Sequence, residues 1–469
     1  MVDVSGNRPP LTSDNAEHTL DHPGLPLPRR IFAVAVLLMM IVALVGGANA
    51  VAIGLPRISA ELAIPAADAI WLQNAYQIVV IVAILPCATL GERIGHRLVF
   101  RLGLASMVAG SGLVLVWPQF MPLIGSRMLQ GLGAALVMSV SPAILRDIYP
   151  SSRLGLAISI NAVGVAVSAA LGPIAGSLIL EAAPWQALFG LFMPVSLLGL
   201  AMSALLPTDE KICRAFDLRG ALLNGLVAGA GMGAMSIAER YPSLALVLLI
   251  AAVAAGIALV LHVRRVTTPF LPLDLLLKRG LGFAYLASTL NFAINAMTVI
   301  SLPFLLIESF GMGIISAGRM MAFWSVAVAG SVVATGLLSD RFPAEPLCLF
   351  GAAAVATGLA LLTGATFIWP TELSAIGIVV AGIGFGSFQA ANNRILIAAA
   401  PRHRRAVAGG LQAMVREVGN GLGFGIAGLS FAFWRGHEPE GTLALALAMA
   451  VSAVMLNITR LSDPPMRRW

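Results

Sequence analysis

The segment Leu90–Arg97 reads LGERIGHR and separates two strongly apolar stretches. A second segment, Gly336–Phe342, reads GLLSDRF and also separates two apolar stretches. Both contain a leucine, a small residue, an acid, an arginine and an apolar residue in the same order. This similarity predicts a duplicated chain in which each copy of the motif joins the second and third helices of a six-helix half.

The composition indicates a protein that is embedded in a lipid bilayer. Hydrophobic residues make up 58% of the 469 residues and charged residues 11%, whereas soluble proteins carry about 25% charged residues. The apolar residues form runs of about 20, which is the length of helix that crosses a bilayer. We therefore expect an all-α polytopic membrane protein with about fourteen transmembrane helices.

The expected spans divide the chain into two halves and a linker. We predict spans at residues 31–53, 70–90, 99–117, 121–145, 154–179, 187–206, 218–238, 242–262, 281–306, 313–338, 346–367, 373–398, 406–433 and 443–458. The predicted domains are a disordered tail at 1–30, an N-terminal six-helix half at 31–206, a linker with a two-helix insert at 207–280, a C-terminal six-helix half at 281–458 and a second tail at 459–469.

The distribution of positive charge favours one orientation in the membrane. The net charge is +7, and in a soluble protein such a charge would suggest nucleic-acid binding. Here most of the 29 Lys and Arg residues lie in alternate short loops, and cytoplasmic loops are the ones enriched in Lys and Arg. The pattern predicts a bacterial inner-membrane protein with both termini cytoplasmic and without a nucleic-acid partner.

Arg127 is a charged residue that is expected inside the membrane, in the span 121–145. An arginine at the centre of a membrane helix costs about 2.5–3.5 kcal/mol on insertion scales, so it usually faces a cavity or a partner. The alternative is a structural side chain that reaches the nearby membrane surface. We favour a functional role because Gly125 and Gly131 let another helix approach closely.

The span 154–179 carries small residues at Gly164, Ser168, Gly172 and Gly176. This spacing of four places them on one helix face, which permits close packing against another helix. Pro173 removes one helical hydrogen bond and is expected to kink the helix. From these residues alone, ordinary helix packing is the simpler interpretation.

Acidic residues within spans are candidates for carrying protons. Of the 22 acidic residues, only Glu308 and Glu417 are expected within spans. Proton-coupled transport requires a group that binds and releases a proton between conformations, and a buried carboxylate can do so. We therefore assign proton coupling to Glu417 and Glu308. Glu417 follows Arg416, and the sequence leaves open whether it carries a proton or belongs to a structural ion pair.

Polar residues deep in the spans are candidates for a substrate cavity between the halves, near the midplane. These residues are Asn49, Tyr76, Gln77, Asn161, Asn291, Asn295, Gln389, Asn392 and Asn393. Each could instead form a hydrogen bond between helices, worth about 0.6 kcal/mol. A lining rich in amides and flexible methionines and poor in carboxylates suits neutral, zwitterionic or weakly anionic amphiphiles better than quaternary cations.

The two repeated segments are candidates for a gate. Glu92 could pair with an arginine or a helix end in one conformation only, and would then act as a latch. The alternative is a loop that only sets the membrane topology, and the presence of two copies favours the latch. The predicted gating residues are Gly91, Glu92, Arg93, Gly95, Arg97, Asp340 and Arg341.

Taken together, these segments resemble the major facilitator superfamily, in particular its fourteen-helix drug:proton antiporter branch. Leu90–Arg97 is similar to the loop between helices two and three, with Glu92 in the usual aspartate place. The sequence RMLQG at Arg127–Gly131 is similar to the helix-four motif. The sequence GPIAG at Gly172–Gly176 is similar to the helix-five antiporter motif. The resemblance covers residues 31–458 and implies a major facilitator fold, efflux by alternating access and a role for Arg127 in proton coupling.

The sequence also departs from this family pattern in the helix-five motif and in the first span. Ser168 and Ser177 replace two glycines of the helix-five motif. The first span of the family usually carries an acidic residue, and Gly47 occupies that position here. The first span therefore lacks the carboxylate to which the family's cation preference and proton carrier are tied.

The sequence thus predicts a secondary active transporter, most simply a proton-coupled exporter of small amphipathic drugs or metabolites. The alternatives are an uptake carrier for a small organic solute and a non-transporting receptor on the same fold. The three isolated cysteines suggest neither a metal site nor a disulfide framework. The sequence also has no Gly-Lys-Ser/Thr phosphate loop. We expect no enzyme, no metal and no cofactor other than a proton gradient, in a monomer whose partners are lipid and substrate.

Overall fold

The computed structural model describes residues 24–150, 153–191, 193–207, 217–266, 276, 279–339, 341–367, 373–399 and 405–462. The regular structure within these residues is helical, without a strand. Thirteen segments are long and apolar enough to cross a membrane. α16 (Arg405–Phe433) is a further long helix that is not among the thirteen and contains Arg416, Glu417 and Asn420. The predicted all-α polytopic fold is therefore confirmed.

The N-terminal half contains the first six spans. Its first span is interrupted by a π-helical turn, and its sixth is divided into short helical pieces. The bounds are α1 (Leu27–Ile41), η2 (Val42–Gly46), α2 (Gly47–Glu61), α3 (Ala66–Ile94), α4 (His96–Val116), α5 (Phe120–Ile148), α6 (Leu154–Ala182), α7 (Ala187–Gly190), α8 (Met193–Met202) and η4 (Ser203–Leu205).

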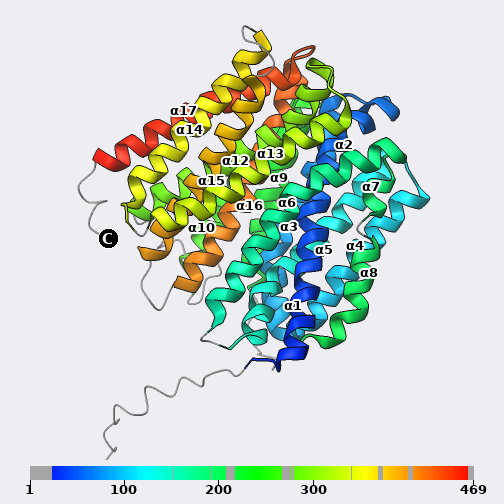
Figure 1. The fold of residues 1–469 in the computed structure, drawn as a ribbon, viewed down its shortest axis with the longest axis vertical. Helices are drawn as coiled ribbons and strands as arrows, with labels where there is room; N and C mark the ends of the chain where they lie inside the picture. Colours follow the sequence, from blue (N-terminus) through cyan, green and yellow to red (C-terminus); the bar gives the residue numbers. More distant parts are fainter. Residues whose placement is uncertain are drawn as a thin grey trace, which may run out of the picture.

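The insert and the C-terminal half contain the remaining helices. The insert consists of α9 (Leu218–Ile237) and α10 (Pro242–Val263). The C-terminal half, besides α16, consists of α12 (Arg279–Phe304), η5 (Leu305–Ser309), α13 (Ile314–Leu338), α14 (Ala344–Phe367), α15 (Leu373–Ala398) and α17 (Glu438–Ser462). In Figure 1 the blue and cyan helices α1, α4 and α5 lie on one side of the molecule and α14 and α17 on the other.

The helices extend beyond several predicted boundaries. α1 begins at Leu27, inside the predicted tail, with Pro28 in its first turn, where a proline is tolerated because its missing N–H has no helical partner there. α17 continues to Ser462, inside the second predicted tail. α3 continues to Ile94, so the predicted loop between the second and third spans is reduced to a turn at Gly95.

The two halves contact each other along two helix pairs. α6 packs on α13, where the Ser325 hydroxyl donates to the carbonyl of Ala169 at 3.0 Å. α3 packs on α16, where a methyl group added to Gly428 would lie 3.4 Å from the side-chain nitrogen of Asn74. These contacts bring the second and fifth spans of each half together across the centre of the bundle.

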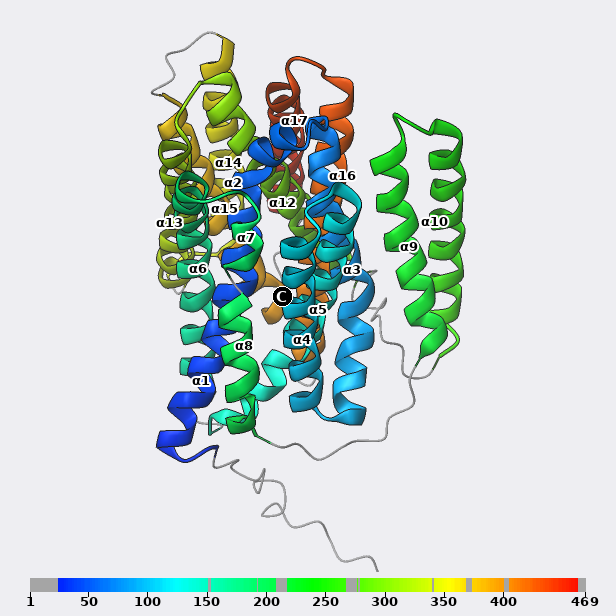
Figure 2. The same cartoon turned by 90° about the vertical axis from the view of Figure 1, so that its right-hand side faces the viewer.

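The insert lies at one edge of the molecule, beside the α3–α16 contact (Figure 2). α9 faces the bundle, and α10 packs on α9 and exposes a row of large apolar side chains, including Val247 and Ile250. A methyl group on Gly421 of α16 would lie 2.6 Å from Ile81 of α3 and 2.8 Å from the sulfur of Met232 of α9. Three helices, one from each part of the protein, therefore meet at Gly421.

In the described part of the C-terminal half, α14 and α15 form the most extensive helix contact, and glycines let their backbones approach closely. A methyl group added to Gly384 would lie 2.6 Å from the carbonyl oxygen of Gly351, well inside contact distance. Gly358 and Gly377 approach each other in the same way farther along the two helices. Small residues that let backbones approach are a main source of helix association in lipid, because apolar side chains gain little there.

Replacing Gly384 by alanine is expected to destabilise the protein by about 1–3 kcal/mol, because the obstructing atoms are backbone and cannot turn away. Gly330→Ala is the matched control, since a methyl group there meets nothing within 4 Å. The measurement is the thermal unfolding midpoint of the two purified variants in detergent. Equal midpoints would show that this backbone contact is not under steric constraint.

The turn between α3 and α4 depends on the backbone of Gly95. Its φ is +100°, a conformation that residues with a side chain rarely adopt. A methyl group there would meet nothing within 4 Å, so the constraint is conformational and not steric. Gly95 accepts this geometry and allows α4 to start immediately after α3 ends.

Gly95→Ala is expected to lower stability by about 1–2 kcal/mol through backbone strain alone. Gly112→Ala is the matched control in α4, since it also has open space and lies within a regular helix. Chemical or thermal unfolding of both variants provides the comparison. If Gly95→Ala is as stable as Gly112→Ala, the turn relaxes without strain and the conformational argument fails.

Candidate functional site

Arg127 lies on α5 and is buried in the interior of the N-terminal half, with 2% of its surface exposed. Its Nε donates to the carbonyl of Leu72 at 3.0 Å, and its Nη2 donates to Oε1 of Gln73 at 2.6 Å. Its Nη1 donates to Oε1 of Gln130 at 2.9 Å. The guanidinium also lies over the ring of Tyr76, 4.6 Å from its centroid. The arginine therefore points into the protein.

Two of these partners extend the network to neighbouring helices. Gln130 donates through its Nε2 to the hydroxyl of Ser111 on α4, at 3.2 Å. Gln73 donates through its Nε2 to the carbonyl of Ala48 on α2, at 3.2 Å. Amide side chains can donate and accept at once, which is why glutamines can connect a cation to neutral groups beyond it. The result is a continuous polar cluster across α2, α3, α4 and α5.

A second polar contact joins the two halves of the protein. Nε2 of Gln77 on α3 donates to Oε2 of Glu417 on α16 at 2.9 Å, and to the Glu417 carbonyl at 3.1 Å. Oε1 of Glu417 accepts from Nε of the adjacent Arg416 at 2.9 Å. Both Gln77 and Glu417 are buried. Glu417 therefore lies in an ion pair and also contacts the opposite half, and its part in proton coupling stays a prediction.

A cavity of about 20 Å³ lies beside Arg127. Tyr76, Ser111 and Gln130 contribute polar groups to its wall, and the remainder is apolar except for the backbone of Gly47. This volume holds about one water molecule. Gly47, which stands in the place of the family's acidic residue, therefore borders the same cavity as the buried arginine.

The other predicted cavity residues are dispersed. The Asn49 amide donates to the carbonyl of Val45 in its own helix at 2.8 Å. Asn291 is buried with its side-chain nitrogen unpaired, and Oδ1 of Asn393 is also unpaired. Asn295 and Gln389 are half-buried. The side chain of Asn161 lies outside the described residues. Of the nine candidates, Tyr76 and Gln77 are the ones placed beside Arg127 and Glu417.

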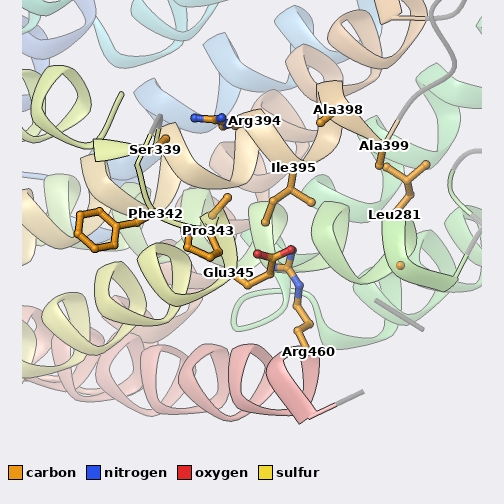
Figure 3. Close-up of a pocket in the computed structure, with 12 residues that line it drawn as sticks. Leu281, Ser339, Phe342, Pro343, Glu345, Arg394, Ile395, Ala398, Ala399 and Arg460 are labelled. Atoms are coloured by element: carbon orange, nitrogen blue, oxygen red, sulfur yellow. The ribbon is translucent and has the colours of Figure 1, made fainter. Parts of the chain in front are cut away.

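Asn392 lies in the C-terminal half and bonds to Arg460, which lines the cavity shown in Figure 3. Its Nδ2 donates to the carbonyl of Ala284 at 3.0 Å, and its Oδ1 accepts from Nη1 of Arg460 at 3.3 Å. Arg460 is 4% exposed and lines a cavity of about 320 Å³ together with Glu345. In Figure 3 the head groups of Glu345 and Arg460 lie side by side, and Arg394 points away from them.

The sequence prediction for Arg460 was wrong. We assigned it to the cytoplasmic tail at 459–469, whereas it lies inside α17 and donates to Oδ1 of Asn457 at 3.0 Å. The signal that could have identified it is the continuation of the apolar pattern through Ile458 and Leu461. A buried arginine at a helix end is easily taken for a loop charge when only its position in the sequence is considered.

Glu308, the third residue assigned to proton coupling, lies in the π-helical turn η5 at the end of α12. It is exposed, and its neighbour Ser309 donates to Oε1 of Glu440 at 2.5 Å. Glu440 is buried in the first turn of α17. Glu308 thus lies at a helix end, whereas Glu417 lies within the interior of α16. Its part in proton coupling stays a prediction.

The small residues of α6 pack against the first span, as their spacing predicted. A methyl group on Gly172 would lie 2.7 Å from the carbonyl oxygen of Gly46, and one on Gly176 would lie 2.9 Å from Cα of Ala50. A methyl group on Gly164 would lie 2.7 Å from Leu38. The Ser168 hydroxyl donates to the carbonyl of Gly164 at 2.6 Å. Pro173 lies within the helix on the same segment.

The predicted gating residues lie at helix ends. Gly91, Glu92 and Arg93 form the last turn of α3, and Arg97 lies in the first turn of α4. A methyl group on Gly91 would lie 2.7 Å from Val140 of α5. Arg341 is exposed directly after α13, and Asp340 lies outside the described residues. The latch itself stays a prediction.

Comparison with known proteins agrees with this arrangement. The Uncharacterized transporter YebQ of Escherichia coli (strain K12) is 31% identical over 457 residues, which cover 95% of this chain and 98% of that protein. The Tetracenomycin C resistance and export protein of Streptomyces glaucescens is 29% identical over 428 residues, which cover 87% of this chain and 76% of that protein.

The fold is also shared with solved structures. The crystal structure of a POT family transporter in complex with 5-aminolevulinic acid superposes with a TM-score of 0.72 at 14% sequence identity, covering 94% of this chain and 97% of that chain. Residues 35–424 match the family model of the Major Facilitator Superfamily. The chain therefore belongs to the major facilitator superfamily, and it is a multi-pass membrane protein that acts as a secondary transporter and not as an enzyme.

Proposed function

We propose that this transporter exports small amphipathic drugs or metabolites across a bacterial plasma membrane, driven by the proton gradient through alternating access. In this proposal the protein acts as a monomer with both termini in the cytoplasm. The orientation is supported by the concentration of Lys and Arg in alternate loops. The monomer is supported by the polar cluster and the contact between the halves, which are both formed within one chain.

The observation that carries the proposal is the hydrogen bond between Gln77 and the buried carboxylate of Glu417. Alternating access requires the halves to separate and rejoin, and this contact lies where α3 meets α16. In the ionised form both oxygens of Glu417 accept, one from Gln77 and one from Arg416. Protonation removes the charge that strengthens both bonds, and it would therefore weaken the contact between the halves.

Proton binding at Glu417 can thus change the relative stability of two conformations, which is the requirement for coupling. Each proton that enters gains about 1.4 kcal/mol per unit of pH difference and about 2.3 kcal/mol per 100 mV of membrane potential. A single proton therefore carries enough free energy to concentrate a drug-like solute by about tenfold or more.

The direction of transport is supported by two observations. The Tetracenomycin C resistance and export protein, by its name, exports its compound. The glycines of α6 that resemble the antiporter motif contact the first span at Gly46 and Ala50, so that motif is part of a helix interface next to the cavity at Arg127. Both observations favour export over uptake.

Glu417→Gln and Arg127→Ala are each expected to reduce gradient-driven accumulation by about tenfold or more, because they remove charge-assisted hydrogen bonds of the buried site. The measurement is accumulation of a panel of amphiphiles in everted vesicles, with acidification of the lumen switched on and off. Glu239→Gln is the matched control, since Glu239 pairs with Arg435 at the surface.

Unchanged flux in both variants would show that these residues do not couple transport to protons. If intact cells accumulate the amphiphiles and everted vesicles do not, the protein is instead an uptake carrier. Gln77→Leu separates the two roles of the site: it leaves the titratable carboxylate in place and removes the contact between the halves. We expect this variant to transport with weakened dependence on lumen acidification.

A further inference from the structure

The buried positive charge of Arg127 has no negative partner within the part of the chain that the structure describes. Its hydrogen-bond acceptors are the carbonyl of Leu72 and the amide oxygens of Gln73 and Gln130, which are all neutral. The ring of Tyr76 adds a further neutral contact. A buried charge is normally paired, because neutral groups replace the hydration of an ion only in part.

Neighbouring charges do not supply the missing counter-ion. Glu417 on α16, which packs on α3, accepts from Arg416 through one carboxylate oxygen and from Gln77 through the other. The negative charge of Glu417 is already paired with the positive charge of Arg416, so the positive charge of Arg127 is not neutralised. Gly47 borders the cavity beside Arg127 and carries no side chain that could compensate it.

The guanidinium also keeps unused donors. A guanidinium has five N–H groups, and the three hydrogen bonds described above use one on each nitrogen. Among the described residues, one N–H on Nη1 and one on Nη2 have no hydrogen-bond acceptor. Two N–H groups of a guanidinium are what a carboxylate needs for a bidentate pair.

The residues that line the cavity also favour a ligand with an apolar part. Leu44, Val51, Met107 and Phe189 line it together with the polar groups. A ligand that fits this wall presents an apolar body next to its charged group. In the described conformation the cavity holds about one water molecule, so a ligand of this kind would bind when the helices around it separate.

We propose that the cargo is an amphipathic organic acid whose carboxylate or sulfonate binds Arg127 in the cavity bordered by Gly47. The proposal rests on the export function proposed above for the statement that the ligand is cargo. The cargo supplies the negative charge that the first span lacks, and its apolar body packs against Met107 and Phe189.

The first test measures binding by the purified full-length protein in detergent, using equilibrium dialysis without a gradient. Three probes share one naphthalene ring: naphthaleneacetate, naphthaleneacetamide and naphthylethylammonium. Wild-type protein is expected to bind the acid at least about tenfold more tightly than the amide, the effect of one charge-assisted pair. A wild type that does not prefer the acid, including one that binds none of the three probes, overturns the proposal.

The second test supplies the missing charge within the chain. Gly47→Asp places a carboxylate at the cavity, and it is expected to remove the preference for the acid and to favour the ammonium probe. Gly47→Asn is the matched control of nearly equal size, and it is expected to keep the acid ahead of the amide. If both variants show the same order of affinities, the effect is steric and the inference fails.

The third test removes the cation. Arg127→Gln is expected to bind the acid no more tightly than the amide, and retained acid preference would place the anion site elsewhere. Folding of each variant is checked by its thermal unfolding midpoint. Binding is measured without a gradient, so its result does not depend on proton-driven export. If the protein prefers the acid but everted vesicles accumulate no probe, proton-driven export is contradicted and the anion site is retained. Gradient-driven export of the ammonium probe alone contradicts the anion site and leaves export intact.

Discussion

A guanidinium that lies within a lipid-embedded bundle has to be solvated mainly by the protein, because bulk water does not surround it and lipid offers no acceptors. Arg127 obtains this solvation from α3 and from its own helix, and its two glutamine partners bond onward to α2 and α4. Four spans of the N-terminal half are therefore held in one arrangement by one buried charge. Moving any of them changes the hydrogen bonds of the others.

α3 connects this cluster to the rest of the protein. Gln73 and Tyr76 face Arg127, and the next residue, Gln77, reaches across to Glu417 in the C-terminal half. Gln73 and Gln77 are four residues apart and lie one above the other on one helix face, so successive turns of α3 present amides to both sites. A change at Glu417 can consequently be felt at Arg127 through one rigid element, without a long chain of intermediate contacts.

The number of spans and the inward orientation of Arg127 could be predicted because both follow from the free energy of placing polar groups in lipid. The partners of Arg127 could not, since Gln73, Gln130 and Ser111 have no spacing that distinguishes them from other amides and hydroxyls in spans. Nine polar residues were assigned to one cavity, yet Asn392 joins Arg460 elsewhere and Asn49 bonds within its own helix. The apolar runs show which polar groups enter the spans, and tertiary packing decides which of these groups are buried and which ones meet.

The insert has a consequence for any motion between the halves. At its contact with α16, Met232 and Met235 of α9 face Gly421 and Gly425, and a methyl group on Gly425 would lie 3.2 Å from the sulfur of Met235. A glycine surface is smooth, and methionine has three torsions that adapt to a shifted neighbour. When the contact between α3 and α16 opens inside a bilayer, acyl chains have to be kept out while the helices move. Here α9 covers this contact with flexible methionine side chains that can follow the motion.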